Sequence, residues 1–317
     1  MTEHTLAAER LHFAWDNSLP AVLEIDPGDT VTFDTWDASG HVVQRTWTSA
    51  EAATRKPKPG VGHALTGPVA VRGARAGDTL VVEVLDVTPA DWGFTMFSPG
   101  RGLLPDDFTS AYLRIWDISD GRFACGLEGV QVPLAPFCGV MGNALAEPGV
   151  HSTIPPRRVG GNMDVRQLTA GSTLYLPIEV PGALFSVGDA HGVQGDGEVC
   201  ITAVEMDSTT RLRFSLSQTP VREPQLRLDR PPTTIGGAYH GCTAHAPDLM
   251  EAARNATRYL IEWLCREAHL TAEDAYILSS VAAELRISQV VDAPNWTVTA
   301  FFPLAVLVSR VPSGGNV

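Results

Sequence analysis

The sequence predicts a mainly β protein with an α+β C-terminal part, in which recurrent hairpins build a β-sandwich or barrel. Three observations predict this class. Short apolar stretches with two-residue alternation fill the first two hundred residues. A Gly-Asp-Thr phrase recurs in front of such stretches. From about residue 247 the apolar spacing changes to 3.6 residues, which is typical of amphipathic helices.

The recurring phrase marks where strands begin. It reads Gly-Asp-Thr-Val at 28–31, Gly-Asp-Thr-Leu at 77–80 and Gly-Ser-Thr-Leu at 171–174. The first copy closes the turn Asp26-Pro-Gly-Asp29, which predicts a hairpin between 22–25 and 30–36. The copies are too far apart and too irregular for a solenoid, so we interpret them as recurrent hairpin turns of a sandwich or barrel.

The middle of the chain is less regular. Residues 89–130 mix proline, glycine and aromatic residues with little periodicity, and we expect long connections that cover part of the core and of a pocket. Further on, 182–187 and 199–204 are apolar stretches typical of strands. The segment between them is therefore expected to be a loop held by two strands.

The C-terminal part has a different pattern. Residues 248–267 carry an apolar stripe at helical spacing, and Thr271-Ala-Glu-Asp resembles a capping box that starts a second helix ending near 284. The segments 286–291 and 297–302 then predict strands. We divide the chain into a β-rich domain, 1–205, which carries the main site loops, and an α+β region, 206–317, packed on it.

The charge balance narrows the class of partner. The 317 residues include 36 acidic and 23 basic residues, a formal charge of −13, which disfavours a nucleic-acid backbone or an anionic membrane. No apolar stretch approaches the ~18–20 residues that span a bilayer, and the five cysteines are scattered as in a reducing compartment. We expect a cytoplasmic protein that acts on a small neutral or cationic molecule.

The segment 184–199 concentrates chemistry-bearing side chains. It contains Asp189, His191, Asp196 and Glu198 among four glycines. Asp189 and His191 are two residues apart, so in an extended backbone both side chains point the same way and could form half of a Zn²⁺, Mn²⁺ or Fe²⁺ site. The alternative is that Asp196-Gly197 is a plain hairpin turn with solvated acids around it.

Other candidates stand elsewhere. Asp37 follows a predicted strand, and Asn162 and Asp164 are two apart in a loop with a double glycine. Cys138 lies in an apolar run without a neighbouring acid or histidine, which favours a small buried hydrophobe over a nucleophile. A further group could imitate a metal triad, although loop histidines are usually solvated: His240, Cys242 and His245. The only lysines, Lys56 and Lys58, lie in a proline-rich segment, which disfavours a buried catalytic lysine.

Several motifs together resemble the acetamidase/formamidase family over most of the chain. The pair Gly160-Gly-Asn-Met-Asp and Gly188-Asp-Ala-His…Gln194-Gly-Asp-Gly-Glu, with Leu-Pro…Pro-Gly-Ala between, is the most specific part. The others are Trp15-Asp-Asn-Ser-Leu-Pro, Pro27-Gly-Asp-Thr-Val-Thr-Phe, Gly67-Pro-Val-Ala-Val-Arg-Gly-Ala, Pro155-Pro-Arg, Tyr175-Leu-Pro-Ile-Glu-Val and Leu285-Arg-Ile-Ser-Gln-Val-Val-Asp.

The resemblance implies a β-rich fold with an α/β extension, homo-oligomers, and hydrolysis of short aliphatic amides to a carboxylate and ammonia. It also implies which positions match the site: Asn162, Asp164, Asp189, His191, Asp196 and Glu198. The aromatic residues of 89–116 are expected to reshape the pocket. A small neutral amide is therefore the expected substrate.

Our hypothesis for the chemistry is a water activated by a divalent metal ion, since no Gly-x-Ser-x-Gly elbow exists and lysine is nearly absent. Asp189 and His191 hold the ion, zinc or else calcium, with help from Asp37 or Asn162. Glu198 moves the proton, with His191 and Asp196 also assigned catalytic roles. Asn162, Asp164 and Gln194 are assigned to substrate binding. The alternatives are a non-catalytic β-sandwich that binds a small molecule and a structural Ca²⁺, and, less favoured, a copper redox protein.

Overall fold

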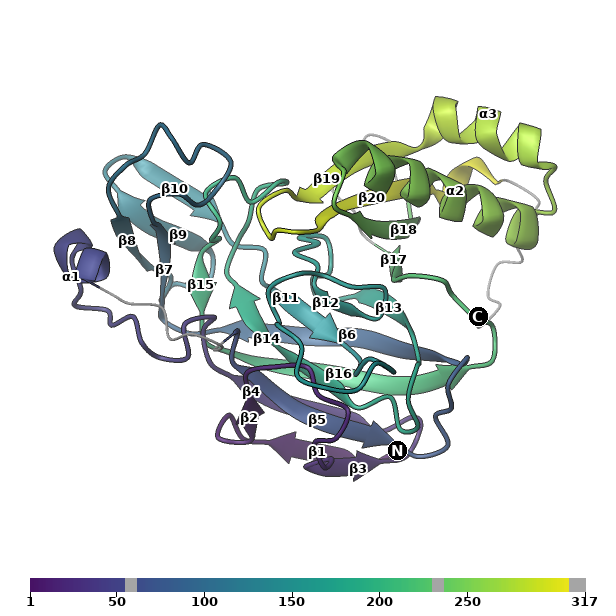
Figure 1. Cartoon of the computed structure of the whole chain (residues 1–317), viewed down its shortest axis with the longest axis horizontal. Coiled ribbons are helices and arrows are strands. Elements are labelled where there is room, and N and C mark those ends of the chain that lie inside the picture. Colours follow the sequence, from purple (N-terminus) through teal and green to yellow (C-terminus); the bar gives the residue numbers. More distant parts are fainter. Residues whose placement is uncertain (55–61, 230–236, 308–317) are drawn as a thin grey trace.

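The computed structural model describes residues 1–54, 62–229 and 237–307. Their strands form two large sheets (Figure 1). The nine-stranded sheet runs in the order β1 (Glu3–Leu6), β4 (Thr30–Thr35), β16 (Ser208–Ser217), β6 (Thr79–Pro89), β13 (Ser172–Pro177), β17 (Gln225–Leu228), β18 (Tyr239–Ala246), β20 (Trp296–Pro303) and β19 (Glu284–Gln289).

The eleven-stranded sheet has β14 (Phe185–His191) at its branching point. Its main path is β10 (Val130–Pro133), β9 (Phe123–Leu127), β8 (Tyr112–Asp117), β7 (Trp92–Phe97), β15 (Glu205–Met206), β14, β11 (Phe137–Gly142) and β12 (Gly160–Asn162). β5 (Leu65–Val71) also pairs with β14, and β2 (Leu11–His12) and β3 (Leu23–Ile25) pair with β5. The short helices of the first and last parts are α1 (Ser49–Thr54) and a 3₁₀ turn (Leu304–Val306).

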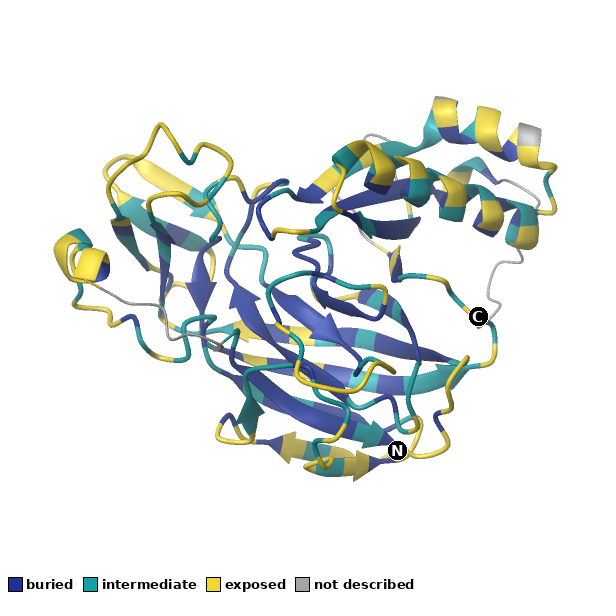
Figure 2. Cartoon of the chain, viewed as in Figure 1, coloured by how far each residue is buried: buried dark blue, intermediate teal, exposed yellow. Residues whose placement is uncertain are grey.

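The two sheets pack face to face, as in a sandwich. The ring of Phe185 on β14 lies 6.2 Å from the ring of Phe33 on β4 and 5.1 Å from that of Phe214 on β16, so one side chain bridges the sheets. Around it, one continuous core draws apolar side chains from both sheets. Figure 2 shows this as buried strands through the middle of the molecule, with exposed residues on the outer helices and turns. The predicted fold class, mainly β with an α+β C-terminal part, is confirmed.

The C-terminal helices form where the sequence predicts them. α2 (Leu249–Ala268) is capped by Asp248, which accepts a hydrogen bond from the N–H of Glu251, and α3 (Ala272–Ala282) is capped by Thr271. Their apolar faces pack on β18 and β20 as a second core. In Figure 1, α2 lies beside β18 and β20, and α3 lies beside α2. The predicted strands near 286–291 and 297–302 are β19 and β20.

Two strand predictions need correction. The turn at Asp26–Asp29 exists, but it is not a hairpin: β3 pairs with β5 and β4 pairs with β1 and β16, so the chain crosses from one sheet to the other. The second Gly-Asp-Thr phrase crosses in the same way, from β5 to β6. All three phrases do open strands of the nine-stranded sheet, namely β4, β6 and β13.

The segment 89–130 is also more regular than its composition predicts. It contains β7, β8 and β9, which form a meander on one edge of the eleven-stranded sheet. Conversely, 199–204 is not a strand; only Glu205 and Met206 pair with β14. Alternation fails here because these strands have partly exposed surfaces on both faces, and composition does not reveal pairing partners.

The division at residue 205 stays a prediction. β16 follows that position and pairs with β4 and β6, while β17 pairs with β13, so one sheet contains strands from both sides of it.

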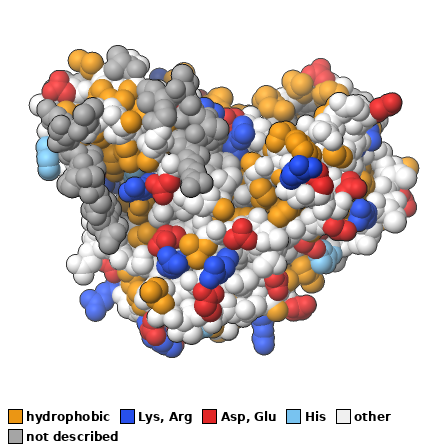
Figure 3. Space-filling view, turned by 180° about the vertical axis from the view of Figure 1, so that it is seen from behind, with side chains coloured by type: hydrophobic (Ala, Val, Ile, Leu, Met, Phe, Trp, Pro, Cys, Tyr) orange, Lys and Arg blue, Asp and Glu red, His pale blue; other side chains and the backbone are white. Residues whose placement is uncertain are grey.

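No helix among the described residues is long and apolar enough to cross a membrane. On the face drawn in Figure 3, Arg side chains lie interspersed with Asp and Glu.

His240 is a core residue rather than a solvated loop histidine. Its ring stacks on Trp263 of α2 with 4.0 Å between centroids, and its Nε2 is buried without a hydrogen-bond partner. Burial, and then the positive charges of Arg266 and Arg227, lower the pKa of His240 from 6.5 to about 3. The histidine is therefore neutral in the folded protein.

Replacing His240 by phenylalanine is expected to make the protein less sensitive to acid. The unfolded chain binds a proton at His240 below pH 6.5, whereas the folded chain does so only near pH 3. The contribution of neutral His240 to the free energy of unfolding is thus complete above pH 6.5 and falls by about 1.4 kcal/mol per pH unit below it. The measurement is urea unfolding of both proteins at several pH values from 7.5 to 4.5. If the free energy of unfolding changed with pH by the same amount in both proteins, the buried neutral state of His240 would be contradicted.

Candidate active site

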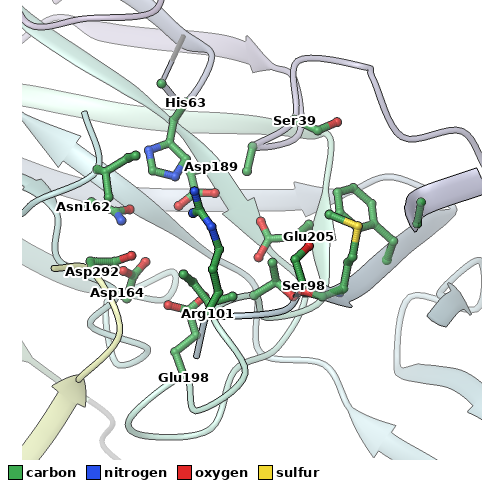
Figure 4. Close-up of a pocket in the computed structure, with 18 residues that line it drawn as sticks. Ser39, His63, Ser98, Arg101, Asn162, Asp164, Asp189, Glu198, Glu205 and Asp292 are labelled. Atoms are coloured by element: carbon green, nitrogen blue, oxygen red, sulfur yellow. Dashed lines mark hydrogen bonds between the residues drawn. The ribbon is translucent and has the colours of Figure 1, made fainter. Parts of the chain in front are cut away.

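A cavity of about 220 Å³ lies beside the middle of the eleven-stranded sheet, and its polar wall is dominated by acids (Figure 4). Five carboxylates line it, and Asn162 and His63 face them: Asp164, Asp189, Glu198, Glu205 and Asp292. Apolar side chains also line it, among them Phe94, Met96 and Ile201. A site of this size suits a small ligand, since pockets for drug-sized molecules have about 300–1,000 Å³.

Strand pairing brings the central residues together. Asp189 and His191 both lie on β14, and Glu205 on β15 is the cross-strand partner of His191. Cross-strand partners have side chains about 4.5–5.5 Å apart at Cβ, so imidazole and carboxylate meet. The His191 Nε2 atom lies 3.4 Å from Asp189 Oδ2 and 3.3 Å from Glu205 Oε2.

Three further acids arrive on irregular segments. Asp164 follows β12, Glu198 lies in the connection between β14 and β15, and Asp292 follows β19. The connection is fastened to β19 by two backbone hydrogen bonds, from Gly197 N–H to Ser288 O and from Val290 N–H to Gly197 O. This contact places the strands of the C-terminal part beside the cavity.

Gln194 fixes the orientation of His191. Its amide N–H₂ donates to the backbone oxygens of Asp164 and Ser288, at 2.9 and 3.4 Å, which leaves its Oε1 to accept from His191 Nδ1 at 2.9 Å. The ring also packs edge-on against Phe137. Since Nδ1 carries the hydrogen, Nε2 of a neutral His191 presents its lone pair to the carboxylates.

The chemistry of these donors fits a cation. Two groups with ligand atoms within 4.8 Å of one another share His191: Asp164 with Glu198, and Asp189 with Glu205. Several of their atoms are buried without a hydrogen-bond partner: both carboxylate oxygens of Asp164, Glu205 Oε2 and His191 Nε2. Buried acceptors are costly unless paired, so their convergence is the arrangement expected of ligands.

Burial shifts the protonation of the whole cluster. Burial and the neighbouring carboxylates raise the pKa of Asp164 and of Glu198 well above the usual range. The same causes raise the pKa of Glu205 to about 7 and that of Asp292 to about 6. Burial acts the same way on Asp189, but His191 and His63 outweigh it and lower its pKa. The acids therefore need a compensating cation to be ionised together.

The backbone is unusual at three of these acids. Asp164, Asp189 and Glu198 have φ values of 50°, 56° and 48°, in the left-handed region. Such residues cost about 1–3 kcal/mol each and cluster at functional sites. Across from them, Gly139 on β11 leaves room for the carboxylates: a Cβ there would lie 2.4 Å from Asp164 Oδ1 and 2.6 Å from Asp189 Oδ2.

The structure brings most of the predicted site residues together and separates two. Asp189, Glu198, Asn162 and Asp164 meet at the cavity, and His191 contacts Asp189. The alternative of a turn with solvated acids is wrong, because Asp189 and Glu198 are only 3% and 7% exposed. Gln194 holds His191 instead of lining the cavity.

Asp196 points away from the cavity. Its carboxylate accepts hydrogen bonds from Gln167 at 3.1 Å and from Arg286 at 3.0 Å, and its side chain is 27% exposed. The expected contribution of Asp37 to the cluster is not met either, because Ser39 N–H binds its carboxylate and its own N–H binds Asp207. Asp37 belongs to a separate group with His41 and Asp207.

Other predicted candidates are settled by burial. Cys138 is in the core, 2% exposed, and burial raises the pKa of its thiol to about 11, so it is a small buried hydrophobe. Cys242 and His245 lie on β18, as His240 does, and His245 Nδ1 is hydrogen-bonded to Thr297 Oγ1. Lys56 and Lys58 lie outside the described residues.

Three site residues escaped the sequence analysis. Glu205 directly follows the apolar stretch 199–204, which predicts a strand and gives no sign of a site residue. Asp292 is the last residue of the family-like motif Leu285-Arg-Ile-Ser-Gln-Val-Val-Asp. That motif was the signal for Asp292. His63 precedes β5 and has no local signal, because only its proximity to β12 and β14 makes it a site residue.

A small cavity with buried acids and an imidazole facing it is the arrangement expected of an active site. The chain belongs to the acetamidase/formamidase family, whose sequence model matches residues 2–152 and 143–308. The expected enzyme class, a hydrolase of amide C–N bonds, is thereby confirmed, and the non-catalytic and copper alternatives are set aside.

Similar proteins cover nearly the whole chain. A formamidase of Methylophilus methylotrophus is 27% identical over 94% of this chain and 89% of its own length. The crystal structure of a predicted acetamidase/formamidase from Thermoanaerobacter tengcongensis is 27% identical, covers 98% of both chains and superposes with a TM-score of 0.89. An acetamidase of Bacillus halodurans is 30% identical, covers 96% of this chain and 99% of its own, and superposes with a TM-score of 0.88.

Proposed function

We propose that the protein hydrolyses short aliphatic amides, of the formamide and acetamide type, with the help of a divalent metal ion held at His191. The observation that carries the proposal is the buried Nε2 of His191, which makes no hydrogen bond and lies 3.4 and 3.3 Å from carboxylate oxygens of Asp189 and Glu205. A lone pair facing two carboxylates is repulsive unless a cation or a proton lies among them.

The residues that would hold the ion are Asp189, His191 and Glu205, and Glu205 takes the place that the sequence analysis gave to Asp37. A nitrogen donor with carboxylates favours Zn²⁺, whereas Ca²⁺ prefers oxygen ligands alone. When bound, such an ion polarises a water molecule or a carbonyl group.

Homo-oligomerisation and a cytoplasmic location remain proposals, drawn from the family resemblance and the composition.

The remaining residues of the cavity position the amide and handle protons. The Oδ1 atom of Asn162 is a buried acceptor without a partner, so it suits the N–H₂ group of a primary amide. Phe94, Met96 and Ile201 offer an apolar wall to a short acyl chain. Glu198, with its raised pKa, takes the proton that the attacking water loses and returns it to the departing nitrogen.

The direct test is ammonia release from formamide, acetamide, propionamide and a bulky aromatic amide, together with elemental analysis of the purified protein. We expect turnover of at least one short amide, none of the bulky one, and about one equivalent or more of a divalent metal. Lack of turnover of every short amide would refute the function, and turnover by fully metal-free protein would refute the role of the ion.

Replacing Glu198 by glutamine is expected to lower kcat by about a hundredfold or more, because proton transfer by a positioned group contributes about 10²–10⁴. The amide keeps the size of the side chain but accepts no proton. Metal content and thermal midpoint are measured beside kcat to separate this loss from loss of the ion. Full activity with unchanged metal content would show that Glu198 does not handle the proton.

A further inference from the structure

Hydrolysis of an amide places negative charge on the carbonyl oxygen in the transition state, and the five carboxylates of the cavity wall repel such charge. Among the ionisable side chains of the wall, two are basic, His63 and Arg101. Arg101 lies on an exposed part of the connection between β7 and β8. His63 is half-buried and lies two residues before Leu65, the first residue of β5, which pairs with β14.

We propose that the Nε2–H group of His63 binds the carbonyl oxygen of the amide and stabilises the oxyanion that forms from it. The inference rests on the proposed function, because it assigns a role within that reaction. Figure 4 shows the imidazole of His63 pointing into the cavity above Asp189 and beside Asn162. It therefore faces the same space as the acids that would hold the ion.

Thr153 determines which ring nitrogen of His63 carries the hydrogen. The hydroxyl of Thr153 is fully buried, and its Oγ1 accepts a hydrogen bond from the backbone N–H of His63 at 2.7 Å. The second contact of this oxygen is with His63 Nδ1, at 3.2 Å. Because the buried hydroxyl needs an acceptor for its own hydrogen, it donates to Nδ1. The hydrogen of a neutral His63 is then on Nε2, which faces the cavity.

The backbone around His63 is packed in place. A Cβ on Gly62 would lie 2.0 Å from Thr153 Oγ1 and 2.9 Å from the backbone oxygen of Phe13, so glycine allows this close approach. The backbone N–H of Gly62 also donates to Phe13 O. A donor held by its surroundings before the reaction begins needs little rearrangement in the transition state, which is the requirement for an oxyanion site.

The step is balanced without a proton leaving His63. The oxygen of water forms a bond to the carbonyl carbon, the C=O π pair moves to oxygen, and the Nε2–H hydrogen bond strengthens as that charge grows. The proton of the water goes to Glu198. When the C–N bond breaks, its electron pair leaves with nitrogen, which takes the proton from Glu198, and the carbonyl re-forms.

Three substitutions test the assignment, with ammonia release measured for each metal-loaded protein. In His63→Ala, kcat is expected to fall about a hundredfold, the usual loss for one oxyanion donor, with KM changed by less than about threefold. In His63→Gln, the amide N–H₂ reaches about as far as Nε2 and recovers activity to within about tenfold of the wild type. In His63→Asn it does not reach, so kcat stays low.

The control is His4→Ala, which removes another half-buried, hydrogen-bonded histidine on β1, the partner of Asp29 at 3.1 Å. Its kcat is expected to equal that of the wild type. Metal content and thermal midpoint of the His63 variants are expected to be unchanged. Loss of metal in His63→Ala would make His63 a ligand, and equal losses in the alanine and glutamine variants would make it a packing residue; either outcome overturns the proposal.

A second measurement does not depend on turnover. Long-range ¹H–¹⁵N NMR spectra of the histidine rings, assigned by the signals lost in His63→Gln, are expected to show the Nε2–H tautomer of His63. In Thr153→Val that preference is expected to weaken. An Nδ1–H tautomer in the wild type would overturn the assignment, whatever the activity. If the tautomer is as expected but no short amide is hydrolysed, the proposed function fails and the oxyanion role fails with it.

Discussion

Replacing Gly139 by alanine is expected to reduce amide hydrolysis to less than about one thousandth and to empty the site of metal. The added Cβ would lie 2.4 Å from Asp164 Oδ1, 2.6 Å from Asp189 Oδ2 and 2.9 Å from His191 Cε1. Real Cβ contacts do not approach so closely, so these side chains must move. A displacement of about 1 Å can cost a hundredfold in rate, and here two of the three proposed ligands, Asp189 and His191, move at once.

The Cβ added in Gly139→Ala clashes with the ends of the Asp164, Asp189 and His191 side chains. We therefore expect it to displace these site residues more than it lowers the free energy of unfolding. The variant is compared with the wild type by ammonia release, by elemental analysis and by circular dichroism. Gly195→Ala is the control, because nothing lies within 4 Å of a Cβ at that position. Near wild-type metal content and kcat in Gly139→Ala, with Gly195→Ala also active, would contradict the assigned ligand cluster.

Removing the metal with a chelator is expected to stop hydrolysis and to destabilise the protein more at pH 8 than at pH 5. In the ion-free protein the pKa of Glu205 is raised from 4.5 to about 7 and that of Asp292 from 3.8 to about 6, with burial as the first cause. Stability from a raised pKa is fully present below the unfolded value and is lost as the pH rises through the folded value.

The pH window therefore runs from 4.5 to about 7 for Glu205 and from 3.8 to about 6 for Asp292. Each group contributes about 1.4 kcal/mol per pH unit within its own window. The measurement is the free energy of unfolding of ion-free and metal-loaded protein at pH 5, 6, 7 and 8. Comparing the two forms cancels the opposite effect of His240, which both contain. A gap that stays constant or shrinks toward pH 8 would show that these carboxylates are not compensated by the ion.

Local features of the fold could be predicted from the sequence, and pairing partners could not. The helices α2 and α3 follow from apolar spacing and from the capping residues Asp248 and Thr271, which act within a few residues. The turn at Asp26–Asp29 was located correctly but assigned to a hairpin, because a turn sequence specifies the chain direction locally and not the strand that lies alongside. β7 to β9 were missed since their alternation is weak.

The same limit explains the site. Asp189 and His191 were found because two-residue spacing on one strand places them together, and the family motifs marked Asn162, Asp164 and Glu198. Glu205 enters the cluster only through the pairing of β15 with β14, and His63 through the folding of the chain before β5. Asp37 is of a residue type that often binds metal ions. Its carboxylate, however, accepts a hydrogen bond from Ser39 N–H, and its own N–H donates to Asp207.

The central position of β16 has a consequence for synthesis of the chain. β16 lies between β4 and β6 and pairs Thr30 with Arg213 and Thr79 with Ser217, so both N-terminal strands lack this neighbour until β16 has been made. At about 5–20 residues per second, the wait after β6 is of the order of ten seconds. During that time unpaired edges are open to chaperones or to aggregation. Asp292 is translated later still, so the cavity wall is completed only after β16 and its neighbours have been made.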